Sequence, residues 1–295
     1  MLEVKNLTKT FDGFAALDNL SLTVPRGSVY GLVGPNGAGK STVIRHIMGV
    51  YRPDTGSVTL DGIPAYENAE LKNTMVCIPD EIFYETADNI KDLKKLYASV
   101  YPKFDEDRFN RLGEVFQLDM KKPVRRFSKG MQKQAAFWLA ISCCPEVLVL
   151  DEPVDGLDPV MRRQIMSIIL EDVAENGTTV LVSSHNLREL EDICDHVGIM
   201  HKGRMMLERS LSALQENMVK VQLVTEQPLP ENLEVVHQSQ VGRVQTLIVR
   251  GGGEQVAELL QQCHPLLCDI LPLSLEEVFI YELGGVDYEV KSILL

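Results

Sequence analysis

The 295-residue sequence lacks any run of about eighteen consecutive apolar residues, the length needed to cross a bilayer as a helix. Its first residues lack a basic stretch followed by a long apolar one, so we expect no signal peptide. It also lacks an excess of positive charge. The formal net charge of −13 argues against nonspecific binding to nucleic acid or to an anionic membrane surface. The six cysteines lack metal-site spacing and read as core residues in a reducing cytosol. These absences favour a soluble, cytoplasmic protein.

A glycine-rich loop is the strongest chemical signal in the sequence. Residues 34–42 read Gly-Pro-Asn-Gly-Ala-Gly-Lys-Ser-Thr, follow the apolar run Val29–Val33, and precede a helical pattern that starts near Lys40. A strand, a loop of this composition and a helix together predict a phosphate-binding site, because loop amides and the helix N-terminus converge on one anion. Lys40 would then reach the β- and γ-phosphates, and the Ser41 hydroxyl would ligate Mg²⁺.

A pair of carboxylates follows a second apolar strand. Val147–Leu150 is apolar throughout, as in a parallel sheet covered on both faces, and it ends in Asp151 and Glu152. Ligands of open α/β sheets bind at the carboxyl ends of the strands. One carboxylate at that edge can hold Mg²⁺ through water, and the next can orient and polarise an attacking water. A third core strand, Thr178–Val182, leads to His185, which we expect at the same edge.

The remaining pattern predicts strands near the start of the chain, an inserted helical block, and a separate C-terminal unit. Strands are expected at Leu2–Leu7 and Leu20–Val24, with a turn at Asp12-Gly13. The helical block should contain Ile90–Val100 and Glu106–Phe116. A further helix opens at 126–132 and is nearly all apolar from Ala135, so its tryptophan should lie in the core.

Six elements, in this order, resemble the ATP-binding subunit of an ABC transporter over about residues 1–215. Asp151 and Glu152 match the family's magnesium aspartate and catalytic glutamate. The other matches are the phosphate loop (Gly34, Pro35, Asn36, Gly37, Ala38, Gly39, Lys40, Ser41, Thr42), the adenine-stacking aromatic (Phe11), an altered Ser-Gly-Gly-Gln signature (Ser128-Lys129-Gly130-Met131-Gln132), the dimer-contact aspartate (Asp158) and the γ-phosphate switch histidine (His185). From the residues alone, Phe11 could equally be a plain sheet residue.

The resemblance implies an ATPase that uses ATP and Mg²⁺ and acts as a head-to-tail dimer. In such dimers ATP on the phosphate loop of one copy is capped by the signature helix of the other. Ser128, Lys129 and Gly130 would complete the cage around the γ-phosphate from a second copy or from a different ATP-binding subunit. Asp158 would contribute at the same interface. No nucleic acid is expected as a partner.

Three departures from the family pattern concern charge. The family usually has a glutamine after the strand Met75–Ile78, where this chain reads Pro79-Asp80-Glu81. We align Asp80 with that glutamine and make it a magnesium ligand beside Ser41 and Asp151, with Glu81 as an alternative. Lys129 changes the signature and could offset phosphate charge in trans, and Asp155 adds an acid near the dimer contact. We still expect a hydrolytically competent site.

The expected fold is α/β: a P-loop NTPase of ABC type with a mostly parallel core sheet, an N-terminal antiparallel β subdomain and a helical subdomain at about 84–144. Residues 216–295 should form a small α+β accessory domain, for packing or dimerisation, that ends in a helix at Leu275–Leu283. A Leu-Glu-Glu-Val-Phe helix, here 275–279, often ends related subunits of drug, peptide and lipid exporters, so we expect export.

The resemblance also implies a separately encoded integral-membrane permease, which would select the substrate and hold this chain at the inner face of the membrane. We expect Ile82-Phe83-Tyr84 to line the groove that receives a cytoplasmic helix of the permease. The alternative is that Phe83 and Tyr84 pack under the helical block. Two other functions remain open: a soluble ABC ATPase of translation or DNA repair, and a nucleotide-gated regulator. The single domain and the lack of a heptad run favour the transporter.

Overall fold

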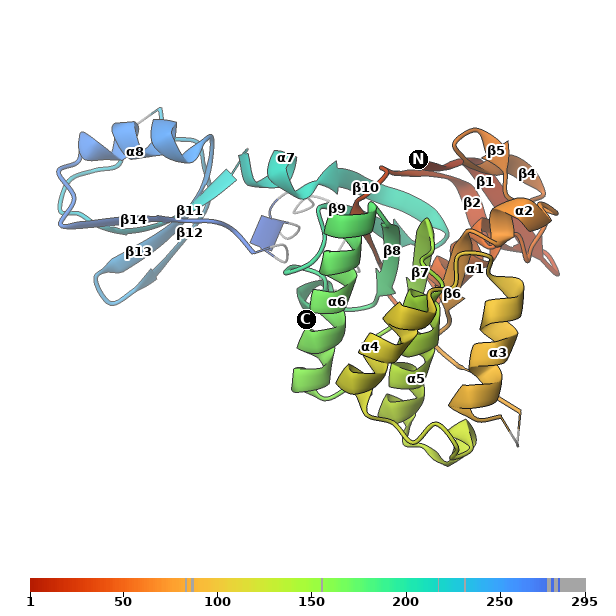
Figure 1. Ribbon diagram of the computed structural model, residues 1–295. Helices are drawn as coiled ribbons and strands as arrows, with labels where there is room; N and C mark the ends of the chain where they lie inside the picture. The colour runs from red at the N-terminus through yellow and green to blue at the C-terminus, as the bar shows by residue number, and fades with distance from the viewer. Residues whose placement is uncertain are drawn as a thin grey trace. The chain divides into compact units, whose positions relative to one another are not determined.

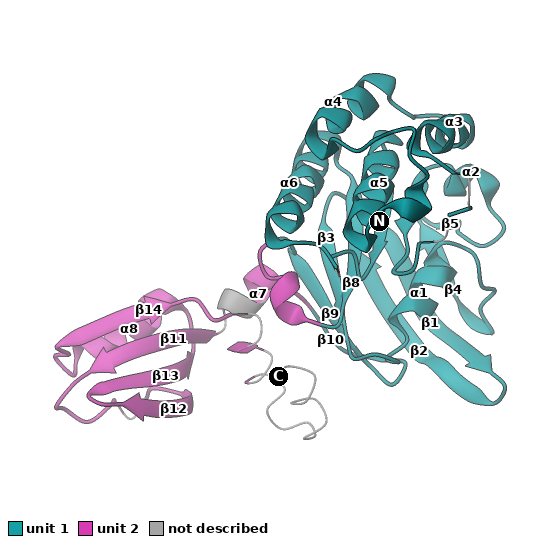
Figure 2. Cartoon of the chain, turned by 90° about the horizontal axis from the view of Figure 1, so that it is seen from below, with its two compact units in different colours: residues 1–185, 193–208 teal, residues 186–192, 209–295 magenta. Residues whose placement is uncertain are grey.

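The chain forms two compact units in the computed structural model. The structure describes residues 1–82, 84–85, 88–154, 156–216, 218–230, 232–274, 277–278 and 281. Unit 1 comprises Met1–His185 and Ile193–Glu208, and unit 2 comprises Asn186–Asp192 and Arg209–Leu295 (Figure 2). Each unit has a hydrophobic core of its own. We describe them one at a time.

An antiparallel sheet opens unit 1. Its strands are β1 (Leu2–Phe11), β2 (Phe14–Val24), β4 (Thr55–Leu60) and β5 (Ile63–Pro64), in the order β2-β1-β4-β5. Asp12 and Gly13 make the predicted turn between β1 and β2 with φ angles of 47° and 85°, and an Asp-Gly pair accepts this left-handed geometry readily. The turn places Phe11 and Phe14 opposite each other at the tip of the hairpin.

A second sheet forms the centre of unit 1. Its strands are β3 (Val29–Val33), β6 (Met75–Ile78), β7 (Val147–Asp151), β8 (Thr179–Ser184), β9 (His196–His201) and β10 (Arg204–Ser210), in the order β10-β9-β3-β8-β7-β6. β3 runs parallel to β8 and β9, and β7 runs parallel to β6 and β8. Every residue of β3, β7 and β8 is buried, as their continuous apolar sequences predict. Their carboxyl ends therefore share one edge.

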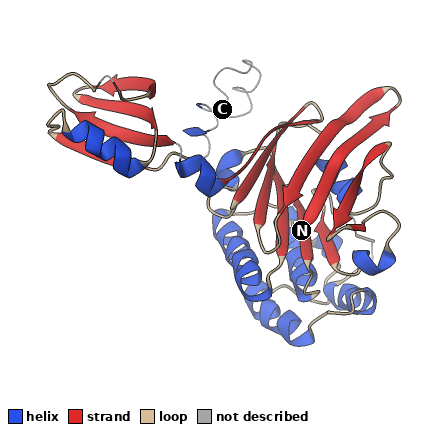
Figure 3. Ribbon diagram, turned by 90° about the horizontal axis from the view of Figure 1, so that it is seen from above, coloured by secondary structure: helices blue, strands red, loops and turns tan. Residues whose placement is uncertain are grey.

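Helices cover this sheet and form the inserted block (Figures 1 and 3). They are α1 (Lys40–Ile47), α2 (Ala69–Lys72), α3 (Ile90–Val100), α4 (Glu106–Phe116), α5 (Lys129–Ser142) and α6 (Pro159–Asn176), with a short 3₁₀ turn at Val124–Arg126. A second 3₁₀ turn, Leu187–Glu189, belongs to unit 2. α1 contributes to a core cluster together with the antiparallel sheet and with β3, β7 and β8. In the block, Trp138 is 2% exposed, stacks on Phe109 and donates its indole N–H to the Phe109 carbonyl at 2.7 Å.

Unit 2 contains a small α+β layer. α7 (Leu211–Glu216) is followed by β11 (Met218–Val224), β12 (Val235–Val241), β13 (Val244–Arg250), α8 (Gly253–Gln261) and β14 (Leu267–Leu271). The strands are ordered β12-β13-β11-β14 and are antiparallel, with α8 along one face (Figure 1). Val256 and Leu260 of α8 pack on Val221 and Leu247 of the sheet. The predicted helix at 275–283 lies mostly outside the described residues.

The predicted fold class is confirmed: a mostly parallel core sheet, an N-terminal antiparallel sheet and an inserted helical block. The helices expected at 90–100 and 106–116 have those bounds. The sequence reasoning did not identify β9 and β10, which extend the parallel sheet beyond β3. No helix in the described part of the chain is long and apolar enough to span a bilayer.

Candidate functional site

The phosphate loop connects the buried strand β3 to α1. At two of its positions the surrounding backbone has no room for a side chain. A Cβ on Gly34 would lie 2.5 Å from the carbonyl oxygen of Met200. Gly39 has φ 104° and a Cβ there would lie 2.8 Å from the carbonyl oxygen of Ala16. Glycine at these positions therefore fixes the path of the loop and its approach to α1.

Lys40, the first residue of α1, is buried and held inside the loop. Its side chain is 6% exposed, and its ammonium nitrogen donates to the carbonyl oxygen of Gly34 at 2.7 Å. The same nitrogen lies 3.2 Å from Oε1 of Glu152, whose side chain is 13% exposed. Loop carbonyls and one carboxylate hold this ammonium group in place. Phosphate oxygens of a bound nucleotide could replace these oxygens as its partners.

Asp151 and Glu152 end β7, and a serine of the neighbouring strand fixes both. The Ser183 hydroxyl donates to Oδ1 of Asp151 at 2.5 Å and accepts the main-chain N–H of Glu152 at 3.1 Å. Glu152 adopts φ 48°, the left-handed region that a non-glycine residue seldom adopts. This turn of the backbone directs the Glu152 carboxylate back toward Lys40.

His185 follows β8 and meets the same carboxylate. Its ring Nδ1 lies 2.9 Å from Oε2 of Glu152, and its main-chain N–H donates to that oxygen at 3.3 Å. The histidine side chain is 45% exposed, so the ring borders solvent. Strands β3, β7 and β8 thus bring Lys40, Glu152 and His185 into one cluster, although 145 residues separate the first from the last.

The three predicted magnesium ligands line one cavity of about 810 Å³. They are Ser41, Asp80 and Asp151; Glu81, the alternative to Asp80, borders the same cavity. The donor set is oxygen only, one hydroxyl and two carboxylates, which fits a hard cation such as Mg²⁺. The described residues contain no group of three His, Cys, Asp or Glu side chains that would hold a metal alone. Mg²⁺ usually keeps several waters and substrate oxygens, so this small donor set is compatible with it.

Asp151 also affects a neighbouring thiol. Burial, and next the negative charge of Asp151, raise the pKa of Cys77 to about 12. Cys77 lines the same cavity. It therefore stays a neutral thiol at physiological pH and is unsuited to act as a nucleophile.

The signature residues occupy the N-terminus of α5. The Ser128 hydroxyl caps the helix by accepting the N–H of Met131 at 3.3 Å, and both Ser128 and Lys129 are exposed. A Cβ on Gly130 would lie 3.0 Å from the carbonyl oxygen of Gly156, so α5 starts close against the loop after β7. That loop ends at Asp158, whose carboxylate caps α6 by accepting the N–H of Val160 at 3.0 Å. Asp155 lies outside the described residues.

Phe11 is partly exposed at the tip of the β1–β2 hairpin. Its exposed fraction is 38%, its ring meets the Tyr51 ring edge-on at 5.4 Å, and the Lys9 ammonium lies 5.5 Å from its centre. Tyr51 therefore supports the aromatic residue that we aligned with the adenine contact. No sequence pattern pointed to Tyr51, because its pairing with Phe11 depends on how β1 packs against the loop after α1.

The expectation for the segment after Asp80 was wrong at Tyr84. Tyr84 is 8% exposed and its hydroxyl donates to the carbonyl oxygen of Gln132 in α5 at 3.3 Å. Tyr84 therefore packs under the helical block, which was the alternative stated in the sequence analysis. Phe83 lies outside the described residues. Other residues that line the 810 Å³ cavity are Arg45, Val50, Lys72 and Tyr101.

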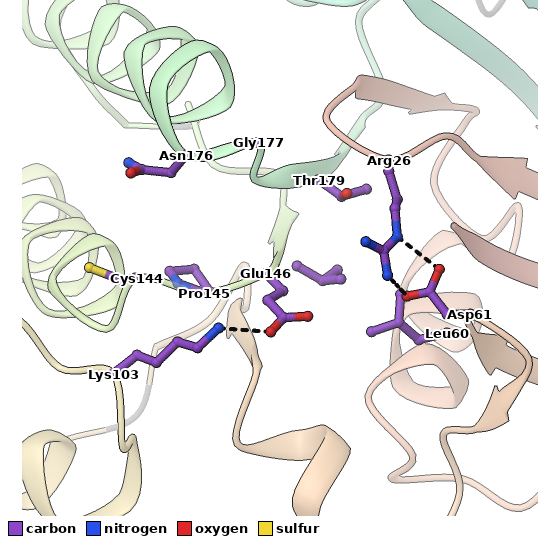
Figure 4. Close-up of a pocket in the computed structure, with 11 residues that line it drawn as sticks. Arg26, Leu60, Asp61, Lys103, Cys144, Pro145, Glu146, Asn176, Gly177 and Thr179 are labelled. Atoms are coloured by element: carbon purple, nitrogen blue, oxygen red, sulfur yellow. Dashed lines mark hydrogen bonds and ion pairs between the residues drawn. The ribbon is translucent and has the colours of Figure 1, made fainter.

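A second cavity, of about 440 Å³, lies at the opposite edge of the parallel sheet (Figure 4). It borders Val147 and Thr179, the first residues of β7 and β8, whereas the nucleotide candidates follow the last residues. Its charged side chains bind one another: Arg26 forms a two-bond pair with Asp61, and Lys103 lies 2.8 Å from Glu146. Its position and its internal pairing separate it from the candidate site.

Two further contributors were missed by the sequence reasoning. Ser183 directly follows the predicted third core strand, Thr178–Val182, and was given no role. Lys133 in α5 was not singled out, yet its ammonium nitrogen donates to the carbonyl oxygen of Glu152 at 2.6 Å. A lysine inside a helix that is otherwise buried was the available signal for Lys133.

Comparisons with known proteins agree with this geometry. The family model described as ABC transporter matches residues 17–155. The ABC transporter ATP-binding protein YtrB of Bacillus subtilis (strain 168) is 30% identical over 290 residues, which cover 97% of this chain and 99% of that protein. The bacitracin transport ATP-binding protein BcrA of Enterococcus faecalis is 35% identical over 219 residues, covering 72% of this chain and 70% of that protein.

A solved structure of the ATP-binding subunit of an ABC transporter is 29% identical, has a TM-score of 0.68, and covers 73% of this chain and 92% of its own. The similarity to YtrB extends over nearly the whole of both proteins, so it includes the C-terminal unit as well as the nucleotide-binding part. Together with the phosphate loop and the carboxylates at the sheet edge, these matches show that the chain belongs to the family of ABC transporter ATP-binding proteins, the ATPase subunits that power ABC transporters.

Proposed function

We propose that Lys40, Glu152 and His185 form the hydrolytic centre for ATP in this chain. The observation that supports the proposal is the proximity of these three side chains. Glu152 Oε1 lies 3.2 Å from the Lys40 ammonium, and Oε2 lies 2.9 Å from His185 Nδ1. Glu152 would orient a water molecule and accept its proton as the water attacks the γ-phosphorus, so that ADP and phosphate leave. Lys40 would bind β- and γ-phosphate oxygens, and His185 would contact the γ-phosphate.

Ser41, Asp80 and Asp151 would hold Mg²⁺, which when bound offsets phosphate charge during the transfer. The residues Gly34, Pro35, Asn36, Gly37, Ala38, Gly39 and Thr42 would complete the phosphate loop, and Phe11 would stack on adenine. Asp151 receives the Ser183 hydroxyl on one oxygen, which fixes the orientation of its carboxylate. Asp80 is half exposed and borders the cavity, so it is accessible from the solvent side.

A second copy, or a different ATP-binding subunit, would complete each site. Ser128, Lys129 and Gly130 lie at an exposed helix N-terminus, where main-chain amides and the lysine are available to a phosphate group. Asp158 caps α6 on the loop that α5 touches through Gly130. We therefore place these residues at a head-to-tail interface that closes when ATP binds.

We further propose that the chain drives export through a separate integral-membrane permease and is held by it at the inner face of the membrane. The likeness to a bacitracin transport ATP-binding protein supports export of a drug, peptide or lipid-like substrate. The cavity that joins Ser41 and Asp151 to Arg45, Val50 and Tyr101 supports a permease contact, since it connects the magnesium end of the site to the helical block.

Co-purification from detergent-solubilised membranes tests the proposal. An affinity-tagged chain expressed in its own cells should retain an integral-membrane protein, and Lys40→Ala should retain that protein while losing ATPase activity. In the same cells Lys40→Ala should increase sensitivity to bacitracin if the substrate is of that class. A chain that purifies without any membrane protein would favour a soluble ABC ATPase. A complex whose function is lost in Lys40→Ala but survives Glu152→Gln, which should bind ATP without hydrolysing it, would favour a nucleotide-gated regulator.

A further inference from the structure

Lys133 is a buried cation that the hydrolytic centre described above does not use. It is the fifth residue of α5, and its side chain is 8% exposed. Ten consecutive residues of this helix, 133–142, are buried. An ammonium group loses hydration when it enters such a position, so it is retained only where other groups replace the water. The groups that surround the Lys133 ammonium therefore indicate the role of this lysine.

The first group is the main chain of Glu152. The Lys133 ammonium donates to the Glu152 carbonyl oxygen at 2.6 Å, while Ser183 accepts the Glu152 N–H at 3.1 Å. The residue is thus held on both sides of its Cα in a conformation with φ 48°. Backbone conformations of this kind persist where surrounding contacts fix them. Lys133 is one of the contacts that keep the Glu152 carboxylate directed at Lys40 and His185.

The second group is Asp80. Its Oδ1 lies 3.9 Å from the Lys133 ammonium, within ion-pair distance. Asp80, which follows β6, and Asp151, the last residue of β7, line one cavity, and Glu152 is the next residue along the chain. Phosphate oxygens would add further negative charge there. Lys40 lies 3.2 Å from Glu152 and offsets part of this charge. Lys133 supplies a second positive charge, at 3.9 Å from Asp80.

We propose that Lys133 is a positioning residue for ATP hydrolysis, which ties α5 to the main chain of Glu152 and balances the charge of Asp80. It acts through these two residues and does not touch the nucleotide. The inference rests on the proposed function, because it takes Glu152 as the group that activates water. α5 begins with the signature residues, so the same helix that would cap the partner's ATP also holds the hydrolytic glutamate of its own chain.

A double-mutant cycle between Lys133 and Asp80 tests the proposal. Lys133→Met removes the charge and keeps the length, and should lower kcat about 10- to 100-fold, as loss of a group that orients an active-site residue does. ATP affinity, measured by equilibrium binding without turnover, should change by less than about threefold, because the groups that bind the nucleotide remain. Asp80→Asn alone is the reference of the cycle, because it removes the charge and keeps one side-chain oxygen, and its kcat is measured at saturating Mg²⁺.

The combined variant separates positioning from simple structural support. Removing the Asp80 charge should recover part of the loss, so that kcat of Lys133→Met/Asp80→Asn exceeds that of Lys133→Met by about tenfold. A role in stability alone predicts a lower melting temperature for the double variant and no recovery. Lys94→Met is the matched control: Lys94 pairs with Glu106 in the helical block, and its loss should leave kcat unchanged. If Lys133→Met unfolds, Lys133→Gln, which keeps an N–H donor, replaces it in the cycle.

Two results would overturn the inference: wild-type kcat in the Lys133 variant, or kcat losses that simply multiply in the double variant. Glu152→Gln is measured in parallel. If it hydrolyses ATP normally, the assignment of Glu152 fails and the proposed function fails with it. If it is inactive while Lys133→Met is normal, only the inference about Lys133 fails.

Discussion

Ser183→Ala removes the hydroxyl group that joins the two carboxylate residues of the site. Ser183 is fully buried, donates to Oδ1 of Asp151 at 2.5 Å and accepts the N–H of Glu152 at 3.1 Å. A hydrogen bond to a charged group contributes about 1.5–3 kcal/mol, and a buried donor left without an acceptor costs about 1–3 kcal/mol. Allowing for partial relaxation, the substitution should lower the free energy of unfolding of unit 1 by about 2–4 kcal/mol.

The single tryptophan gives a direct readout of unit 1. Trp138 is buried in α5, so its fluorescence follows denaturant unfolding of the unit that contains the site. Ser28→Ala is the matched control, because the buried Ser28 hydroxyl makes one bond, to the neutral carbonyl of Pro25 at 2.7 Å. It should cost about 1 kcal/mol or less.

Ser183→Ala should also lower kcat, because the main chain of Glu152 loses the acceptor of its N–H. Equal unfolding free energies for the Ser183 and Ser28 variants would show that the hydrogen bonds of Ser183 to Asp151 and Glu152 do not stabilise unit 1 as expected. Normal stability together with reduced kcat would contradict the expected loss of unfolding free energy. It would still support the role of Ser183 in positioning Glu152.

Three further predictions concern separate parts of unit 1. Asp80→Ala should raise the Mg²⁺ concentration needed for half-maximal ATPase activity, and an unchanged Mg²⁺ dependence would remove Asp80 from the metal site and direct attention to Glu81. Burial lowers the pKa of His46 below its usual value, although its Nδ1 lies 2.7 Å from the Thr42 carbonyl oxygen. The unfolded chain therefore binds more protons than the folded one near pH 6.5, so stability should fall as pH drops from about 7 to 5, and less steeply in His46→Gln. Gly34→Ala should lower the melting temperature and ATP affinity together, because its Cβ would approach a main-chain oxygen to 2.5 Å; wild-type values for both would refute the steric argument.

The sequence predicted those strands and helices whose structure follows from their own local pattern of residues. The apolar runs at 29–33 and 147–150 specify buried parallel strands, and the helices expected at 90–100 and 106–116 have those bounds. Parallel strands end at one edge, so the approach of His185 to Glu152 could be anticipated from topology. Their 2.9 Å separation agrees with that expectation.

The sequence could not show contacts that depend on how one element is rotated against another. Lys133 meets Glu152 because α5 presents that side chain to the end of β7, and Tyr84 is buried because the same helix covers it. Tyr51 reaches Phe11 from a loop that packs on β1. In each case the residue type permitted both a buried and an exposed position, and tertiary packing decided between them.

Glu152→Gln gives the most direct measurement of the central claim. The amide keeps the shape of the side chain and loses the proton acceptor, so the variant should bind ATP with near wild-type affinity, hydrolyse it at a rate lower by about 100-fold or more, and accumulate as an ATP-dependent dimer in light scattering. Glu146→Gln is the control, because Glu146 precedes the other end of the same strand, β7, and pairs with Lys103. It should hydrolyse ATP normally and show no such dimer. Wild-type hydrolysis by Glu152→Gln, with no dimer in ATP, would contradict the assignment of Glu152 as the residue that activates water.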